Sequence, residues 1–165
     1  MVTNEGFLEF GWENQGCWIW CIPVSEITSD DPPVFYDDRW GKIFQVNSSI
    51  SEYAIQQLLY KTKFNFFGGG TVEEQPFFEI LEAIESEYTR CALPDLYAFG
   101  CNICFFEGVD TVIEVWRGGS YLELWFGTRT KQRCREALVF FENIGVTFDN
   151  IIDDEIYLPN FKNNG

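Results

Sequence analysis

The sequence has no histidine among its 165 residues. Without histidine the chain cannot form the Ser-His or Cys-His pairs of common nucleophilic enzymes, and most metal-hydrolase mechanisms are excluded as well. An enzyme of this composition would have to use carboxylates, as glycosidases do. Acidic residues are so frequent that a suitable pair could be found anywhere, so their presence is not informative. No Lys-Ser or Lys-Thr follows Gly68-Gly69-Gly70, which indicates a loop and not a phosphate-binding motif.

Basic residues are also scarce. The chain has 11 Lys and Arg against 26 Asp and Glu, for a formal net charge of −15. Binding to nucleic acid or to an anionic membrane needs a positive surface, so both are excluded as partners, whereas a basic protein would be attracted. The alternative is that the charge only keeps the domain soluble. The placement favours oriented association, because residues 1–38 and 64–89 hold acidic but no basic side chains while basic residues cluster over 129–135.

Long apolar runs are missing too. No segment approaches the ~20 residues that a membrane span requires, and no charged-then-apolar signal opens the chain. We therefore expect a cytoplasmic protein with reduced thiols.

The six cysteines predict free thiols, with no metal and no cofactor. Cys101-x-x-Cys104 falls in a β-prone run, where residues three apart point to opposite faces and cannot share a metal. Cys17 and Cys21 share a face, but four strand residues separate them by about 13 Å. That distance is too long for one ion.

The first half of the chain predicts four strands and a helix. The strands are expected at residues 6–10, 17–22, 34–36 and 40–46. The apolar run 17–22 has the composition of a central strand buried on both faces, and Pro23 ends it or marks an edge. A helix is expected over 52–60 with Ser51 as its N-cap. Its apolar residues at helical spacing are Ile55, Leu58 and Leu59.

The second half predicts a helix, a three-stranded meander and a closing helix. The first helix is expected over about 74–88, with an apolar stripe at Phe77, Leu81, Ile84 and Tyr88. Glycine-containing connections between β-rich runs predict antiparallel hairpins. These runs are 98–107, 111–116 and 121–126, with Phe105, Val115 and Leu124 on neighbouring central strands. The closing helix is expected over about 130–143, ended by Gly145, with a stripe at Cys134, Ala137, Leu138 and Phe141.

These elements predict an α+β fold, in which a mainly antiparallel sheet carries helices packed on one face. The length fits a single domain over residues 1–160, followed by a frayed tail over 161–165.

The turn Glu13-Asn14-Gln15-Gly16 links the first two expected strands. A glycine there permits a backbone angle that other residues resist, and Asn14 can bond its own backbone in the turn. This structural interpretation is sufficient without a functional one.

That turn belongs to a longer pattern, the run from Phe10 to Trp18 followed by Asp31-Pro32-Pro33-Val34, Trp40 and the helix led by Ser51. In these motifs the chain resembles the SUKH superfamily, which includes fungal cell-wall-assembly regulators and many bacterial immunity proteins. The resemblance covers residues 7–60 best and residues 122–150 more loosely. Its motif residues are expected to be structural: Glu13, Asn14, Gln15, Gly16, Pro32 and Pro33.

The resemblance implies an immunity protein, which binds a cognate toxin of basic nuclease or deaminase type and blocks it without catalysis. An acidic surface would raise the association rate, and a few aromatic side chains would anchor the complex. The candidate partner-binding residues are Asp30, Asp31, Asp37, Asp38 and Trp40, then Glu79, Glu82 and Glu85. For each, the alternative is a solvated surface residue. A carboxylate-based hydrolase and a non-catalytic regulatory scaffold remain as alternative functions.

Members of the superfamily usually carry helices before the first strand, whereas this chain begins almost at that strand. Either that part is missing or a neighbouring subunit covers the sheet instead. An uncovered sheet face or edge promotes association. The sequence therefore predicts a symmetric homodimer that forms through a sheet or helix surface lined by aromatic residues.

Overall fold

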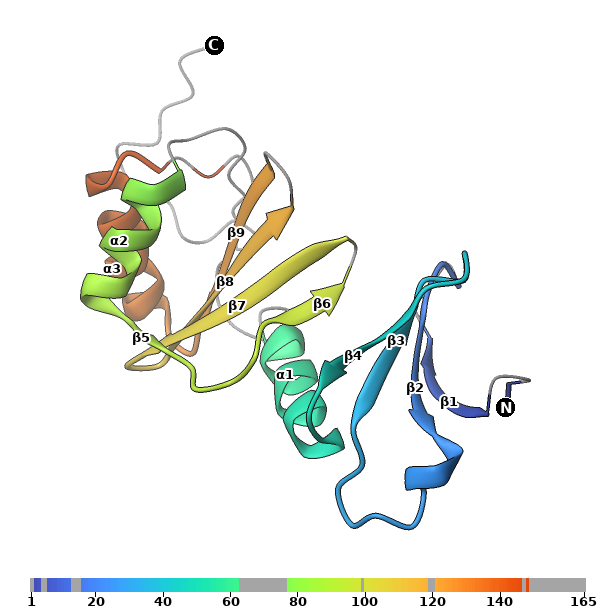
Figure 1. Cartoon of the computed structure of the whole chain (residues 1–165). Helices are drawn as coiled ribbons and strands as arrows, with labels where there is room; N and C mark the ends of the chain where they lie inside the picture. The colour runs from blue at the N-terminus through green and yellow to red at the C-terminus, as the bar shows by residue number, and fades with distance from the viewer. Residues whose placement is uncertain are drawn as a thin grey trace. The chain divides into compact units, whose positions relative to one another are not determined.

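The computed structural model describes residues 2–3, 6–12, 16–62, 77–98, 100–118, 121–146 and 148. The chain divides into two compact units, Met1–Gln57 and Leu58–Gly165. The described residues form two antiparallel sheets and three α-helices, which confirms the predicted α+β class (Figure 1). The single domain over residues 1–160 stays a prediction, and the tail 161–165 lies outside the described residues.

The first unit contains a four-stranded sheet in the order β1-β2-β3-β4, in which every neighbouring pair is antiparallel. Its strands are β1 (Phe7–Trp12), β2 (Ile19–Pro23), β3 (Val34–Asp37) and β4 (Ile43–Asn47). β2 is an inner strand whose residues 19–22 are all buried, so the prediction of a strand buried on both faces is confirmed. The expected strand 40–46 begins three residues too early, because Trp40 lies in the connection that precedes β4.

The first turns of α1 (Ile50–Thr62) pack on this sheet. The ring of Tyr53 lies 5.3 Å from that of Phe10 and 5.7 Å from that of Trp20, measured between centroids. Gly11 makes this approach possible, because a Cβ there would come within 3.2 Å of the Tyr53 hydroxyl oxygen. These aromatic contacts fix the helix to the sheet within the first unit.

The expected N-cap of this helix is wrong by two residues. Ser49 Oγ accepts a hydrogen bond from the main-chain N–H of Glu52 at 3.1 Å. The Glu52 carboxylate in turn accepts from the N–H and the hydroxyl of Ser48, at 3.0 and 2.6 Å. These hydrogen bonds satisfy main-chain N–H groups that have no partner within the helix at its start. Ser51, the expected N-cap, lies inside the helix.

The expected apolar stripe of α1 is also wrong. Ile55 and Leu58 are 48% and 67% exposed, whereas the polar Gln56 is completely buried. Gln56 can be buried because its Oε1 accepts a hydrogen bond from Nδ2 of Asn47, itself buried, at 2.8 Å.

The second unit contains the predicted meander. β7 (Cys101–Gly108), β8 (Thr111–Gly118) and β9 (Tyr121–Thr128) are consecutive antiparallel neighbours, and Phe105, Val115 and Leu124 lie on them as expected. The short strands β5 (Thr89–Arg90) and β6 (Leu96–Ala98) both pair with β7. The expected continuous run 98–107 is therefore broken, and Gly100, with φ of 75°, lies at the break.

Two helices cover one face of this sheet, α2 (Phe77–Glu87) and α3 (Lys131–Asn143) (Figure 1). The α3 prediction is confirmed: Thr130 caps the helix, Gly145 follows it with φ of 78°, and all four stripe residues are buried. In α2, Ile84 is buried, and Leu81 and the following Tyr88 pack against the core. The side chain of Phe77 and the expected helix start near residue 74 lie outside the described residues. The core shared by both helices and the sheet includes Ile84, Phe106, Ile113, Phe126, Leu138 and Phe141.

All six cysteines are free thiols. Cys101 and Cys104 both lie in β7, as the strand interpretation requires. Burial raises the pKa of Cys21 and of Cys104 to about 11, so these thiols are protonated at neutral pH and weakly reactive. Among the described residues no group of three or more Cys, Asp or Glu could hold a metal ion. None of the described helices has the length and apolar character needed to cross a membrane.

Candidate functional site

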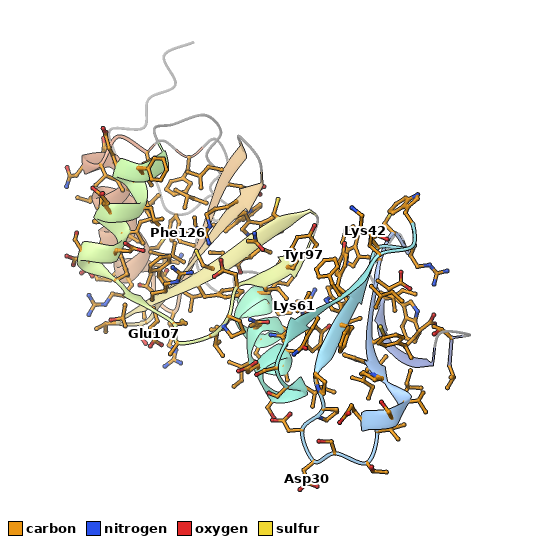
Figure 2. The ribbon with its side chains drawn as sticks, in the orientation of Figure 1. Asp30, Lys42, Lys61, Tyr97, Glu107 and Phe126 are labelled. Carbon is orange, nitrogen blue, oxygen red and sulfur yellow. The ribbon has the colours of Figure 1, made fainter. Side chains whose placement is uncertain are left out.

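The aspartates that sequence reasoning grouped around the proline turn lie at two ends of the first sheet. Asp30 and Asp31 precede β3, whereas Asp37 ends it and Asp38 follows it. A four-residue strand spans about 13 Å, so the two pairs are separated along the sheet and only Asp37 and Asp38 lie near Trp40 in the chain. Figure 2 shows this separation through Asp30 and Lys42, which lie at opposite ends of the sheet. The expected grouping of all four aspartates around the proline turn is therefore wrong, and their role in binding a partner stays a prediction.

Asp31 has a structural role at the start of α1. One of its carboxylate oxygens accepts a hydrogen bond from the main-chain N–H of Ser51 at 2.9 Å. This bond is the largest of the effects that lower the pKa of Asp31. A carboxylate at this position also interacts favourably with the positive end of the helix dipole.

The motif residues that were expected to be structural are only partly within the described region. Pro32 is buried and Pro33 is half-buried, which agrees with a role in shaping the entry to β3. Gly16 has φ of 71°, in the left-handed region that favours glycine. Glu13, Asn14 and Gln15 lie outside the described residues.

The other end of the sheet carries a loop over residues 38–42, which we term the Trp40 loop. One oxygen of Asp38 accepts hydrogen bonds from the main-chain N–H groups of Trp40 and Lys42, at 2.8 and 2.9 Å. Asp37 accepts from the N–H of Arg39 at 2.7 Å. The bond from Lys42 is the main cause of the lowered pKa of Asp38. These carboxylates hold the backbone of the loop in one conformation.

The backbone angles agree with an ordered, sharply bent loop. Arg39 has φ of 65° and Gly41 has φ of 97°. A non-glycine residue in the left-handed region is uncommon and is maintained only where the surrounding contacts favour it. Here the hydrogen bond from Arg39 N–H to Asp37 supplies such a contact.

Trp40 is presented at the surface by this loop, with 79% of its area exposed. Trp12 in β1 is also exposed, and it pairs with Ile19, which pairs in turn with Asp37. The register therefore brings the ends of β1 and β3 to the same end of the sheet. The exposed indoles of Trp12 and Trp40 therefore lie at the same end of the first sheet.

The Trp40 loop together with Asp37 carries no net charge. Asp37 and Asp38 are balanced by Arg39 and Lys42, and the Arg39 guanidinium also lies 3.5 Å from the Glu9 carboxylate. The two aspartates direct their oxygens to the amides of the loop itself. The two carboxylates therefore stabilise the conformation of the loop. The exposed indole of Trp40 is the large apolar group that the loop presents to solvent.

The second candidate surface, on α2, is acidic as expected. Glu79, Glu82 and Glu85 are all exposed and recur at helical spacing on one face of the helix. Phe78 is exposed next to them. The helix has no basic residue in its last turn, so its negative charge is not balanced there.

Two carboxylates, those of Glu114 in β8 and Glu123 in β9, lie on the other face of the second sheet. Glu114 is 1% exposed, and the indole N–H of Trp116 donates to it at 3.1 Å. On the neighbouring strand the indole N–H of Trp125 donates to Glu123. Burial at Glu114 gives a substrate no access from solvent, so this pair does not favour catalysis.

Comparisons of the chain with protein-family models, with curated proteins and with solved structures find no match. The resemblance to the SUKH superfamily therefore stays a prediction. The exposure of Trp12 was missed by sequence reasoning. Its position, two residues beyond Phe10 and directly before the Glu13 turn, was the signal that could have placed it at the end of a strand.

Proposed function

We propose that this chain is a non-enzymatic, cytoplasmic binding protein that neutralises a cognate basic toxin of nuclease or deaminase type. The observation that carries the proposal is the exposed indole of Trp40 on a loop whose backbone is already ordered. Binding then requires little additional ordering of the loop, which removes one of the usual costs of association.

Trp40 would act as the anchor of the complex. A tryptophan buries 150–250 Å² in a contact, and anchors of this kind contribute about 2–4 kcal/mol when truncated to alanine. Trp12 at the same end of the sheet would extend the contact. The loop would occlude the toxin by occupying its surface, without any chemical step.

The charge of the chain would act mainly on the rate of association. A net charge of −15 attracts a basic protein over distances longer than a contact, and the acidic face of α2 contributes to this field. Steering of this kind weakens as salt screens the charges. We therefore expect the association rate to fall with ionic strength while the effect of Trp40 on dissociation persists.

The proposal is tested by capture followed by neutralisation. The wild-type chain, Trp40→Ala and Ile27→Ala are used to capture partners from the native host. Ile27 is a matched control, since it is an exposed apolar residue in the same unit, beyond the opposite end of β2. The captured protein is then expressed in bacterial cells, alone and with each variant, and growth is measured.

We expect a basic protein that stops growth when expressed alone, and growth restored by the wild type and by Ile27→Ala. Trp40→Ala should raise the Kd about 30- to 1,000-fold, the equivalent of the anchor energy above. A partner that binds without affecting growth would favour the regulatory scaffold. Equal affinities of wild type and Trp40→Ala would show that the Trp40 loop is not the binding site.

A further inference from the structure

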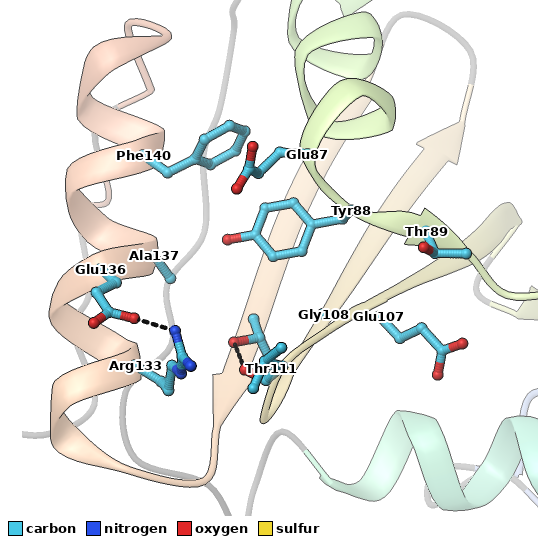
Figure 3. A pocket seen from close by; sticks show the side chains of 11 residues that line it. Glu87, Tyr88, Thr89, Glu107, Gly108, Thr111, Arg133, Glu136, Ala137 and Phe140 are labelled. Atoms are coloured by element: carbon cyan, nitrogen blue, oxygen red, sulfur yellow. Dashed lines mark hydrogen bonds and ion pairs between the residues drawn. The ribbon is translucent and has the colours of Figure 1, made fainter.

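A pocket of about 380 Å³ lies in the second unit, between the end of α2, α3 and the β7–β8 hairpin (Figure 3). Its volume falls in the range of sites that bind small molecules or single side chains. Sequence reasoning did not identify it, because its residues come from five elements: α2, β5, β7, β8 and α3. Those used below are Glu87, Tyr88, Gly108, Arg133, Glu136 and Phe140.

Two aromatic rings form fixed walls of this pocket. The rings of Tyr88 and Phe140 meet edge to face, 5.2 Å apart at an interplanar angle of 74°. Gly108 leaves room for the Tyr88 ring, since a Cβ at Gly108 would lie 2.8 Å from a ring carbon. The ring is thus held between the hairpin backbone and α3, and its orientation does not depend on a ligand.

The single basic residue among those that line the pocket is already paired. The Arg133 guanidinium donates to one oxygen of Glu136 at 2.5 Å, and Gln132 Nε2 donates to the other at 2.8 Å. These two bonds, that from Gln132 first, lower the pKa of Glu136. The Arg133–Glu136 pair therefore contributes no net charge to the pocket.

Glu87 carries the remaining negative charge at the aromatic walls. Figure 3 shows its carboxylate beside the rings of Tyr88 and Phe140, whereas that of Glu107 points away from them. Among the described residues Glu87 has no hydrogen-bond or ion-pair partner. The pKa of Tyr88 is raised, first by burial and then by Glu87 and Glu136, which indicates a negative potential at the phenol despite Arg133.

We propose that this pocket binds an alkylguanidinium group, with Glu87 as its carboxylate acceptor and the rings of Tyr88 and Phe140 as its aromatic walls, on one of which the planar group stacks. A guanidinium fits this set better than an ammonium does. It is planar, stacks on aromatic faces and donates two parallel hydrogen bonds to one carboxylate. An anion would have to displace Glu136 from Arg133 and face Glu87.

The guanidinium could belong to a free small molecule or to an arginine side chain of a protein. The inference goes beyond the proposed function, because it depends on the pocket alone and not on the Trp40 loop. An arginine of a basic toxin would be one natural occupant. The pocket would recognise the same guanidinium group in both cases. The probes below distinguish a free small molecule from a protein side chain.

The test is a titration of the full chain followed by NMR of the aromatic resonances of Tyr88 and Phe140. The probes are agmatine, a blocked Gly-Arg-Gly peptide, the same peptide with lysine, and inorganic phosphate. The variants are Glu87→Gln, which removes the acceptor, and Arg133→Gln, which releases Glu136. Glu142→Gln is the control, an identical charge change at an exposed position of α3 that does not line the pocket.

We expect saturable shifts with a Kd on the order of 1 mM for agmatine and the arginine peptide, and at least several-fold weaker binding of the lysine peptide. Glu87→Gln should weaken binding about fivefold or more, Arg133→Gln should strengthen it, and Glu142→Gln should change it less than about twofold. A gain of affinity in Arg133→Gln cannot arise from misfolding. Tighter binding of the peptide than of agmatine would assign the site to a protein side chain, and the reverse to a free molecule.

Three results would overturn the inference: no shift with either guanidinium probe, equal weakening by Glu142→Gln and Glu87→Gln, or shifts at these rings with phosphate alone. Each is independent of Trp40→Ala, so failure of this pocket is distinguishable from failure of the proposed toxin-binding site.

Discussion

The buried amide pair Asn47–Gln56 is predicted to be energetically coupled, and replacing either member alone should destabilise the first unit. Both side chains are at most 1% exposed, and a 2.8 Å hydrogen bond joins them. Gln56→Met keeps the approximate shape but leaves Asn47 Nδ2 without this acceptor. A buried polar group left without its partner costs about 1–3 kcal/mol, so the free energy of unfolding should fall by that amount.

The double variant Asn47→Leu/Gln56→Met should be less destabilised than the sum of its two single variants. Replacing both partners removes the stranded donor and the stranded acceptor together, and the coupling energy should be about 1–2 kcal/mol. Asn47 Oδ1 has no hydrogen-bond partner among the described atoms, so Asn47→Leu also removes the cost of burying it. This gain is common to the single and the double variant and leaves the coupling energy unchanged. Replacing both partners of a buried hydrogen bond by apolar side chains of the same shape often leaves the free energy of unfolding nearly unchanged.

Urea denaturation followed by far-UV circular dichroism measures these quantities. Gln57→Met, the same substitution one position along the helix, is the control and should change the free energy of unfolding by less than about 0.5 kcal/mol. Strict additivity of the two single variants would refute the reasoning, because it would mean that Asn47 and Gln56 do not stabilise one another.

Four further predictions follow from the described contacts. Gly108→Ala should push the Tyr88 ring out of place, lower the free energy of unfolding by about 1–3 kcal/mol and abolish guanidinium binding; unchanged urea midpoints and titrations would contradict this. The pKa of Asp38 is lowered in the folded chain, so its bonds favour the ordered Trp40 loop above the unfolded pKa and are lost as the pH falls through the folded value. The protection of the Trp40 amide from exchange, relative to its intrinsic rate at each pH, should then fall in acid, whereas in Asp38→Asn it should be low at every pH. At pH 8 a thiol reagent should modify Cys21 and Cys104 slowly in the folded chain, and all six cysteines after denaturation without reductant; a protected pair would indicate a disulfide. Light scattering should detect the predicted homodimer, strengthened by salt that screens the charge of −15, and a strict monomer at high concentration in low and high salt would exclude it.

The sequence predicts α3 well because all its signals agree. Thr130 is a good N-cap, Gly145 a good stop, and the apolar stripe is the stripe that the core needs. The helix α1 was placed correctly, but its buried face was not. There a polar side chain, Gln56, is buried because a partner nine residues away satisfies it, and no local pattern contains that information.

The candidate site was only partly predictable for a similar reason. Asp30 and Asp38 are close in sequence, but the strand between them is extended and separates them. The roles of Asp31 and Asp38 depend on main-chain N–H groups that the fold brings to them, at Ser51 in one case and at Lys42 in the other. The pocket beside Tyr88 was not predicted from the sequence, because it forms only when two helices and a hairpin pack together.

Because the tryptophans differ in exposure, the intrinsic fluorescence of the chain can report whether the Trp40 loop is occupied. Trp20 and Trp116 are each 8% exposed, while Trp40 is 79% exposed, so a quencher dissolved in water reaches the Trp40 indole far more readily than theirs. Acrylamide suits this purpose better than iodide, because it carries no charge and a chain of net charge −15 repels an anion. The part of the fluorescence that acrylamide quenches fastest comes from the most exposed indoles, chiefly Trp40. Protection of that part on adding a partner would report occupancy of the Trp40 loop without any label.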